Sequence, residues 1–129
     1  TLVSKGDAQT IGCDTLIYRL LFNLVENAIR YSAPSSTVQI GARAEGDRVL
    51  LRVRDQGPGI PKQYQTSIFQ PFFRVDRSRS RAYGGVGLGL ALVWEIAALH
   101  GGSIEVEESS KRGTTMLVIL PARAPGSLK

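Results

Sequence analysis

A glycine-rich segment at residues 84–89 could place backbone N–H groups against a phosphate. Its sequence is GGVGLG, and an apolar run follows at once, which is typical of a loop that opens a helix and binds an anion. A dinucleotide-binding fingerprint counted from Gly85 would need glycine at position 90, and a P-loop would need lysine there. Leu90 excludes both. If the segment binds a nucleotide, the site is therefore of another kind.

A second group of polar residues falls on one face of a predicted helix. At about 100° per residue, their side chains lie within an arc of about 100°, and Tyr31 borders that arc. The group is Asn23, Glu26, Asn27 and Arg30. One interpretation is the solvent-facing stripe of an amphipathic helix. The other is a metal–phosphate site, because asparagine is unfavourable in mid-helix and amide oxygens suit a hard cation such as Mg²⁺.

A third candidate is Asp55, which begins the sequence DQGPGIP at the end of a predicted strand. Asp, Gly and Pro dominate ordinary turns, so a simple turn is one interpretation. The other is a carboxylate at the floor of a pocket, with Gly57 and Gly59 letting a flat ligand approach the backbone. The sequence alone leaves both interpretations open.

The composition indicates one compact domain, with 43% hydrophobic and 21% charged residues in a chain of 129. Cys13 is the only cysteine, so no internal disulfide can form and a reducing compartment is indicated. No apolar run approaches the ~18 residues that a membrane span needs, and the first residues lack a signal-peptide pattern. Because the chain starts at Thr1, we expect it to be a piece of a longer protein.

The formal net charge is +5, and four arginines fall between Arg74 and Arg81. Such a cluster could bind nucleic acid, a membrane surface or the phosphates of a small ligand, or it could be a solvated loop. Interleaved aromatic residues for base stacking are missing, so we expect no nucleic-acid partner. The segment from Arg74 to Tyr83 is expected to be mobile without nucleotide, because little burial would offset its ordering entropy.

The elements that must position these residues follow from the pattern of apolar residues. A hairpin is predicted across Gly46-Asp47, and a glycine cap at Gly101-Gly102 ends a second helix. An edge strand or two is expected before the first helix. In chain order, the others are helix 14–32, strands 37–45 and 48–55, irregular residues 62–86, helix 88–100, strands 103–108 and 114–120, and a frayed tail at 121–129. Helices on one face of a mixed, mostly antiparallel sheet make a two-layer α/β sandwich of class α+β.

Five motifs together resemble the ATP-binding catalytic domain of sensor histidine kinases, in the GHKL superfamily (Bergerat fold) that also holds DNA gyrase, Hsp90 and MutL. In order, the motifs are NLVENAIRYS, DQGPGIP, IFQPFFRVD, GGVGLGLAL and GTT. The likeness extends from about Gly12 to Leu120, so we expect one ATP-binding domain over residues 1–129 with its core at 12–120. It implies that the glycine segment closes a flexible lid over ATP and starts the helix that meets the phosphates.

The resemblance also implies a role for each candidate. Asn27 would hold Mg²⁺ through its side-chain oxygen, and Asn23 would support metal and phosphate. Tyr31 would pack on the adenine, and Asp55 would accept a hydrogen bond from the adenine amino group. The other implied contacts to ATP are Arg30, Gly57, Gly59, Gly85, Gly87, Leu88, Gly89 and Thr114, with Arg74 as a candidate for the terminal phosphate. Met116 stands where an aromatic residue often follows GTT.

Members that hydrolyse ATP carry a glutamate four residues before the metal asparagine, where this chain has Asn23. The resemblance therefore implies a protein-histidine kinase with little hydrolysis of its own, and Glu26 is a further candidate for the catalytic base. The acceptor histidine is expected on an upstream dimeric helical hairpin, with His100 structural. A response regulator receiver domain is the expected next acceptor. The alternatives are an ATP-binding regulator or weak ATPase of the same fold, and a basic binding module on the arginine cluster.

Two expectations concern the setting of this domain. Alone, it should be monomeric and nearly inert, because the histidine that receives phosphate would be on another domain. It should lie on the cytoplasmic side of a membrane, with the full-length protein anchored by segments outside this sequence.

Overall fold

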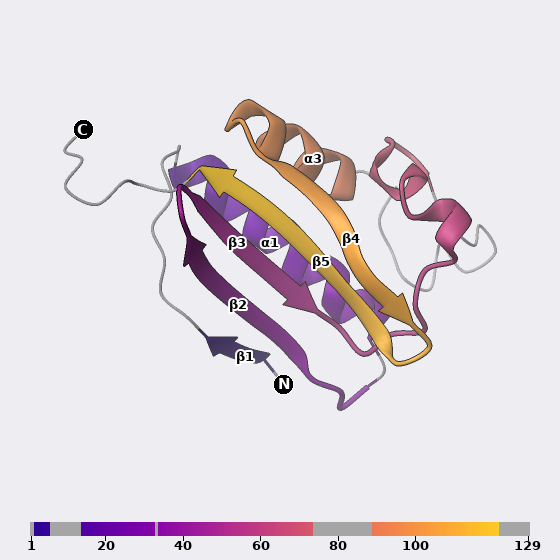
Figure 1. Cartoon of the computed structure of the whole chain (residues 1–129). Coiled ribbons are helices and arrows are strands. Elements are labelled where there is room, and N and C mark those ends of the chain that lie inside the picture. The colour runs from indigo at the N-terminus through magenta and orange to yellow at the C-terminus, as the bar shows by residue number, and fades with distance from the viewer. Residues whose placement is uncertain (1, 6–13, 33, 74–88, 122–129) are drawn as a thin grey trace.

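The computed structural model describes residues 2–5, 14–32, 34–73 and 89–121 (Figure 1). Their strands form one five-stranded sheet in the order β1-β2-β3-β5-β4. Strand β1 is parallel to β2, and every other neighbouring pair is antiparallel. The strands are β1 (Leu2–Lys5), β2 (Val38–Glu45), β3 (Arg48–Arg54), β4 (Ser103–Ser110) and β5 (Gly113–Pro121). The predicted mixed, mostly antiparallel sheet is confirmed.

Helices α1 (Asp14–Tyr31) and α3 (Gly89–Leu99) lie side by side against one face of this sheet (Figure 1). Two 3-10 turns, η1 (Lys62–Tyr64) and η2 (Ser67–Phe69), lie beyond the β4 edge. The two-layer α+β sandwich expected from the sequence is therefore confirmed. In the described part, the other sheet face carries no helix.

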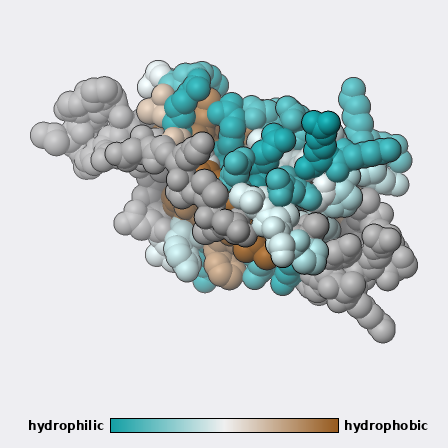
Figure 2. All heavy atoms as spheres, turned by 90° about the horizontal axis from the view of Figure 1, so that it is seen from below, coloured by the Kyte–Doolittle hydropathy of each residue, from teal (hydrophilic) through white to brown (hydrophobic). Residues whose placement is uncertain are grey.

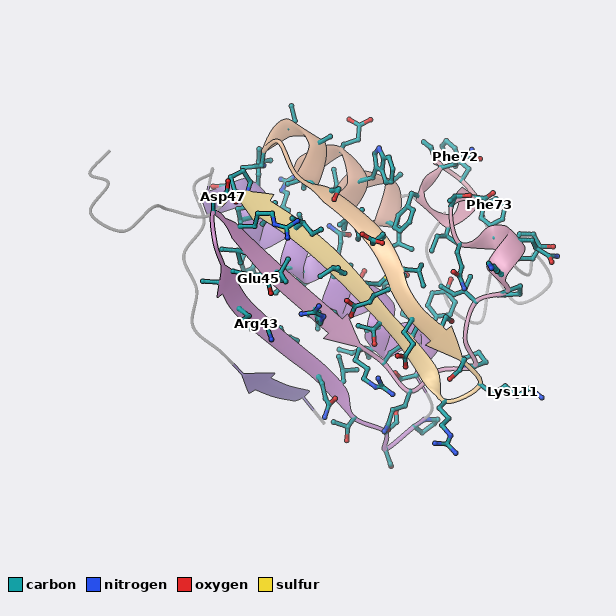
Figure 3. All side chains as sticks on the ribbon, in the orientation of Figure 1. Arg43, Glu45, Asp47, Phe72, Phe73 and Lys111 are labelled. Atoms are coloured by element: carbon teal, nitrogen blue, oxygen red, sulfur yellow. The ribbon has the colours of Figure 1, made fainter. Side chains whose placement is uncertain are left out.

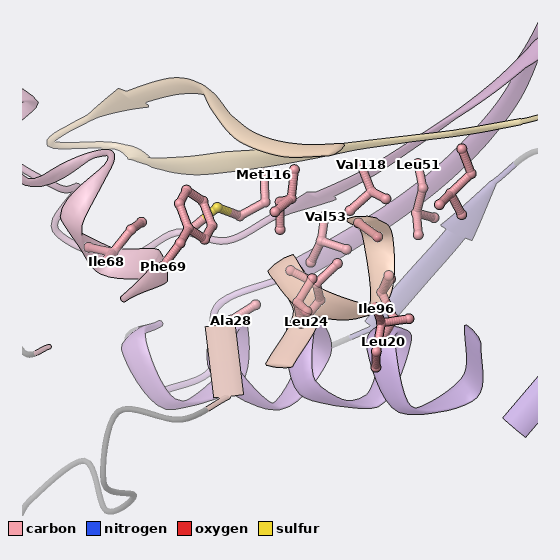
Figure 4. Packing of buried hydrophobic residues seen from close by; sticks show 14 of the residues in the cluster. Leu20, Leu24, Ala28, Leu51, Val53, Ile68, Phe69, Ile96, Met116 and Val118 are labelled. Carbon is pink, nitrogen blue, oxygen red and sulfur yellow. The ribbon is translucent and has the colours of Figure 1, made fainter. Parts of the chain in front are cut away.

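The core lies between the helices and the sheet, as Figure 4 shows. Leu20, Leu24 and Ala28 recur every fourth residue, so one stripe of α1 is buried. This stripe packs with the inner side chains of the sheet, of α3 and of η2. The labelled partners are Leu51, Val53, Ile68, Phe69, Ile96, Met116 and Val118.

Helix α3 ends at the predicted glycine cap. Gly101 adopts a left-handed φ of +74°, which glycine reaches without a Cβ clash. The Gly102 N–H donates to the Ala97 carbonyl at 2.7 Å, and the Gly101 N–H donates to the Ala98 carbonyl at 3.0 Å. These two bonds form a Schellman motif, which satisfies the last carbonyls of the helix.

The second hairpin is longer than predicted. The sequence pattern placed residues 109–113 in a loop, but Ser109 pairs with Thr114 and Ser110 with Gly113. Only two residues, Lys111 and Arg112, connect the strands, and Lys111 lies at the tip (Figure 3). The loop prediction was wrong because serine and glycine carry no apolar alternation, whereas backbone pairing does not depend on it.

The open face of the sheet carries several ion pairs, between strands and within them. Figure 3 shows Arg43 and Glu45 on β2, where their side chains are 2.7 Å apart. Arg52 donates two hydrogen bonds to Glu107, at 2.7 and 2.8 Å, and this contact lowers the pKa of Glu107. Seen from below, hydrophilic residues cover most of the described surface, with smaller hydrophobic areas between them (Figure 2).

Several predicted features lie outside the described residues. They are the arginine cluster and expected mobile segment at 74–83, the glycines at 84–88, Cys13 and residues 122–129 of the predicted tail. The tail prediction was wrong for its first residue, Pro121, which ends β5 and pairs with Arg48. Among the described helices, none has the length and apolar character needed to cross a membrane.

Candidate functional site

Asp55 follows β3 directly and is only 6% exposed. Its backbone N–H donates to the Thr114 carbonyl at 2.9 Å. Its Oδ1 accepts the N–H of Gly57 at 2.9 Å and the N–H of Thr114 at 3.1 Å. No described donor is bonded to Oδ2, and no fully buried side-chain oxygen in the described part lacks a partner. Oδ2 is therefore open to solvent and keeps its capacity to accept a hydrogen bond from a ligand.

Burial raises the pKa of Asp55, because a charged carboxylate loses hydration inside the protein. The N–H groups of Gly57 and Thr114 act in the opposite direction on this pKa, as does the positive charge of Arg54. These donors favour the ionised form, so the site holds a carboxylate by backbone hydrogen bonds rather than by an ion pair.

The glycines after Asp55 are required by the chain itself. A Cβ on Gly57 would collide with the carbonyl oxygen of Tyr31, at the end of α1. Gly59 has a φ of +87°, and a Cβ there would collide with the carbonyl oxygen of Ser110. Close approach of two backbone segments therefore requires glycine at both positions. The approach of a ligand to this backbone stays a prediction.

Side chains tie the same loop on both sides. Toward α1, the Gln56 N–H donates to Ser32 Oγ at 3.3 Å, and Gln56 Oε1 accepts the Thr37 N–H at 2.9 Å. Toward the β4–β5 hairpin, the Ile60 N–H donates to Ser109 Oγ at 2.7 Å. The sequence pattern did not identify Ser32, Thr37 or Ser109 as residues that hold this loop. Gln56 could have been noticed as the one long polar side chain inside DQGPGIP.

Asn23 lies beside the start of α3. Its Nδ2 donates to the Arg19 carbonyl at 2.8 Å, one turn earlier in α1. Its Oδ1 would be 3.4 Å from a Cβ on Gly89, the first residue of α3. The amide is thus fixed with its oxygen toward the N-terminus of α3, the end of a helix at which backbone N–H groups can meet an anion.

The rest of the polar face of α1 is half-buried or exposed. Asn27 lies one turn after Asn23, and in the described part its side chain makes no hydrogen bond. Arg30 Nη2 lies 3.4 Å from Glu26 Oε1. Such an exposed pair, four residues apart on a helix, stabilises by only about 0.3–0.5 kcal/mol. A phosphate could therefore separate Arg30 from Glu26 at little cost.

The predicted site residues fall into two groups. Asp55, Gly57, Gly59 and Thr114 form one cluster at the ends of β3 and β5, and Tyr31 joins it through its backbone. The second group lies along α1 and the start of α3: Asn23, Glu26, Asn27, Arg30 and Gly89. Arg74, Gly85, Gly87 and Leu88 are outside the described residues. Among the described residues, no three His, Cys, Asp or Glu side chains cluster as metal ligands would.

Relatives by sequence are bacterial signalling kinases. The chain is 45% identical over 119 residues to the sensor-like histidine kinase SenX3 of Mycobacterium tuberculosis, covering 92% of this chain and 29% of SenX3. It is 43% identical over 103 residues to the circadian input-output histidine kinase CikA of Synechococcus elongatus, covering 80% of this chain and 14% of CikA. The chain thus spans well under a third of these relatives.

The solved structures that resemble this chain include histidine kinases. The mycobacterial sensor histidine kinase MprB matches with a TM-score of 0.82 and 30% identity, over 95% of this chain and 81% of that one. Full-length ShkA, solved in complex with AMPPNP, matches with a TM-score of 0.80 and 26% identity, over 95% of this chain and 26% of that one. The family model described as histidine kinase-, DNA gyrase B- and HSP90-like ATPase matches residues 12–124. The chain therefore belongs to this GHKL family, as an ATP-binding domain of the sensor histidine kinase type.

Proposed function

We propose that residues 1–129 form a single domain that binds Mg-ATP and transfers the γ-phosphate to a histidine on a separate, dimeric helical-hairpin domain. From that histidine the phosphate passes to an aspartate of a response regulator, in a two-component system. The observation that carries the proposal is the buried carboxylate of Asp55. It is held by two backbone N–H groups and keeps one oxygen open to a ligand.

Asp55 supports the choice of adenine. The 6-amino group of adenine is a donor, so it complements an open carboxylate oxygen, whereas guanine has a carbonyl acceptor at that position. Two like acceptors facing each other would leave both without a donor in a partly desolvated place. Thr114 and Tyr31 would line the same end of the nucleotide.

Along α1, Asn27 and Asn23 offer amide oxygens, which suit Mg²⁺. In protein sites Mg²⁺ usually keeps waters and binds phosphates together with one or two protein oxygens, so a large carboxylate cluster is not required. When bound, the metal would neutralise charge on the phosphates. Arg30 would meet a phosphate after leaving Glu26, and Gly89 would offer backbone N–H groups at the start of α3. The proposed nucleotide contacts of Arg74, Gly85, Gly87 and Leu88 would complete the phosphate end.

Transfer to a protein, rather than to water, follows from the chemistry at position 23. An amide cannot accept a proton as a general base can, and the Asn23 amide is bonded to its own helix. Glu26 remains a candidate base. His100 has a structural role at the end of α3, where its Nδ1 is 2.8 Å from the Ile96 carbonyl. The acceptor would therefore come from the helical hairpin.

The relatives are named as sensor kinases and are several times longer than this chain. This supports a full-length protein with a sensing part, a membrane anchor outside this sequence and the kinase domain on the cytoplasmic side. The isolated domain would be monomeric and nearly inert, because positioning of the acceptor supplies most of the acceleration in phosphoryl transfer.

Two measurements test the proposal. Calorimetry should show Mg-ATP binding that is clearly tighter than GTP binding, and comparable affinities would contradict the assignment of Asp55. Radiolabelled ATP should label the histidine of a helical-hairpin domain added in trans. Rapid ATP hydrolysis by the domain alone, lost in Asn27→Ala, would instead favour the alternative of an ATPase with the same fold.

A further inference from the structure

Strand β4 carries a β-bulge at Glu107. Val106 pairs with Met116 on β5, but the next pair joins Glu108 to Thr115, so Glu107 is an extra residue. An extra residue reverses the side-chain alternation for the rest of the strand. Residues after Glu107 therefore face the side opposite to the one that unbroken alternation would give.

Two ion pairs on the open sheet face agree with this reversal. Arg52 and Arg54 are two residues apart on β3, so they share a face. Glu107 is bonded to Arg52 at 2.7 Å, and Glu108 lies 3.6 Å from Arg54. Consecutive glutamates thus serve the same face, which a regular strand would not allow.

The consequence is that Ser109, rather than Glu108, lies opposite Thr114. Ser109 Oγ is 2.9 Å from Thr114 Oγ1 and accepts the Ile60 N–H at 2.7 Å. Thr114 in turn is bonded to Asp55 through both its N–H and its carbonyl. One hydroxyl therefore connects the far end of the glycine loop to the residue that holds the carboxylate.

We propose that Ser109 is a positioning residue for the base end of the site: its hydroxyl sets the spacing between the loop at residues 56–60 and Thr114, and so sets where Asp55 presents its open oxygen. This inference rests on the proposed function, because it assumes that Asp55 selects the base. Ser109 itself does not touch the nucleotide. It acts by holding two groups that flank Asp55.

Ser109→Ala would leave the Ile60 N–H without its acceptor and the Thr114 hydroxyl without its partner. We expect ATP binding to weaken by roughly fivefold to tenfold, with little effect on GTP, so that the ratio of the two affinities falls. Ser109→Thr keeps the hydroxyl and should restore the ratio. The matched control is Ser110→Ala, because among the described residues Ser110 Oγ accepts only the exposed Arg112 N–H in the hairpin turn.

The experiment measures two quantities on the parent and on the three variants. Calorimetry gives the affinities for ATP and GTP, and amide hydrogen exchange without nucleotide gives the protection of Ile60. Faster exchange at Ile60 with a lower ATP-to-GTP ratio in Ser109→Ala alone supports the proposal. Unchanged exchange, or faster exchange with an unchanged ratio, overturns it while the proposed function stands. A parent protein that binds no ATP overturns both.

Discussion

The two ends of the proposed nucleotide site differ in how much of their geometry the protein alone determines. At the base end, Asp55 is buried and receives hydrogen bonds from its own loop and from β5. At the phosphate end, the hydrogen bond and the ion pair of the described side chains stay within α1: Asn23 is bonded to Arg19, and Glu26 is paired with Arg30. The base end is thus formed before a ligand arrives, whereas the phosphate end offers groups that a ligand must gather.

This difference suits a kinase. A preformed acceptor selects the base without reorganisation, and selectivity is greatest when a wrong partner leaves a buried group without a donor. The phosphates, by contrast, must be held in one geometry only while an acceptor is present. Weak local pairs such as Glu26 with Arg30 can be exchanged for phosphate contacts at each turnover.

The largest effect is expected from a substitution that disables the phosphate end alone. Asn27→Ala should reduce labelling of the acceptor histidine by roughly 100-fold or more, because the metal would lose its amide ligand. Preference for ATP over GTP in residual binding should survive, since Asp55 is untouched. The measurement is phosphate incorporation in trans, with calorimetry on the same variant. Loss of base preference together with labelling would mean that the two ends are not separable.

The second change breaks the base end alone. Asp55→Ala should weaken ATP binding by about tenfold or more, since a desolvated hydrogen bond to a charged group contributes about 1.5–3 kcal/mol. GTP binding should change much less, so the preference should nearly vanish. Competition between the two nucleotides reports this directly. An Asp55→Ala protein that still prefers ATP would place base selection elsewhere.

A pH titration sharpens the same point. Burial raises the pKa of Asp55 above its ordinary 3.8, so the carboxylate is lost by protonation as the pH falls through that raised value. ATP affinity should fall with it, and the fall should be absent from Asp55→Asn. The free energy of unfolding depends on pH in the opposite direction. Because the folded state binds the Asp55 proton more tightly than the unfolded state does, this group stabilises the fold below pH 3.8. That stabilisation is lost as the pH rises through the raised pKa. Urea unfolding of parent and variant across this range measures that term.

The smallest effect concerns the ion pair on α1. Glu26→Gln should change the free energy of unfolding by no more than about 0.5 kcal/mol, because the pair is largely exposed. ATP binding should be unchanged or slightly tighter, since Arg30 is released for phosphate. A large loss of histidine labelling with intact ATP binding would instead identify Glu26 as the catalytic base.

Much of the fold was predictable because apolar periodicity marks it. The alternation of Val49, Leu51 and Val53 predicts the central strand, and the long run without glycine or proline after Asp14 predicts α1. The far end of the second hairpin was not predictable. Ser109 and Ser110 carry no apolar signal, and a bulge changes which side chain faces inward without changing the composition.

The candidate site also has a part that the sequence predicted and a part that it did not. Motifs identified Asp55 and the polar residues of α1, because residue type and spacing carry that information. The partners that hold Asp55 come from segments far apart in sequence, such as Thr114, and depend on backbone atoms that all residues share. For Gly57, the motif indicated a need for a small residue, but the cause, which is the nearby Tyr31 carbonyl, became visible only in the structure.

The parallel pairing of β1 with β2 has a consequence for the order in which this fold opens. The hairpins β2–β3 and β4–β5 join neighbours in sequence, whereas β1 reaches β2 only across α1 (Figure 1). Helix α1 is therefore part of the connection between β1 and β2, and the N-terminal side of that connection is held in the sheet by an edge strand of four residues. Local unfolding that frees β1 would release the start of α1 first, while the hairpins still hold Asp55. Asn23, Asn27 and Arg30 lie in the later half of α1, so opening of this kind would begin away from both ends of the proposed site.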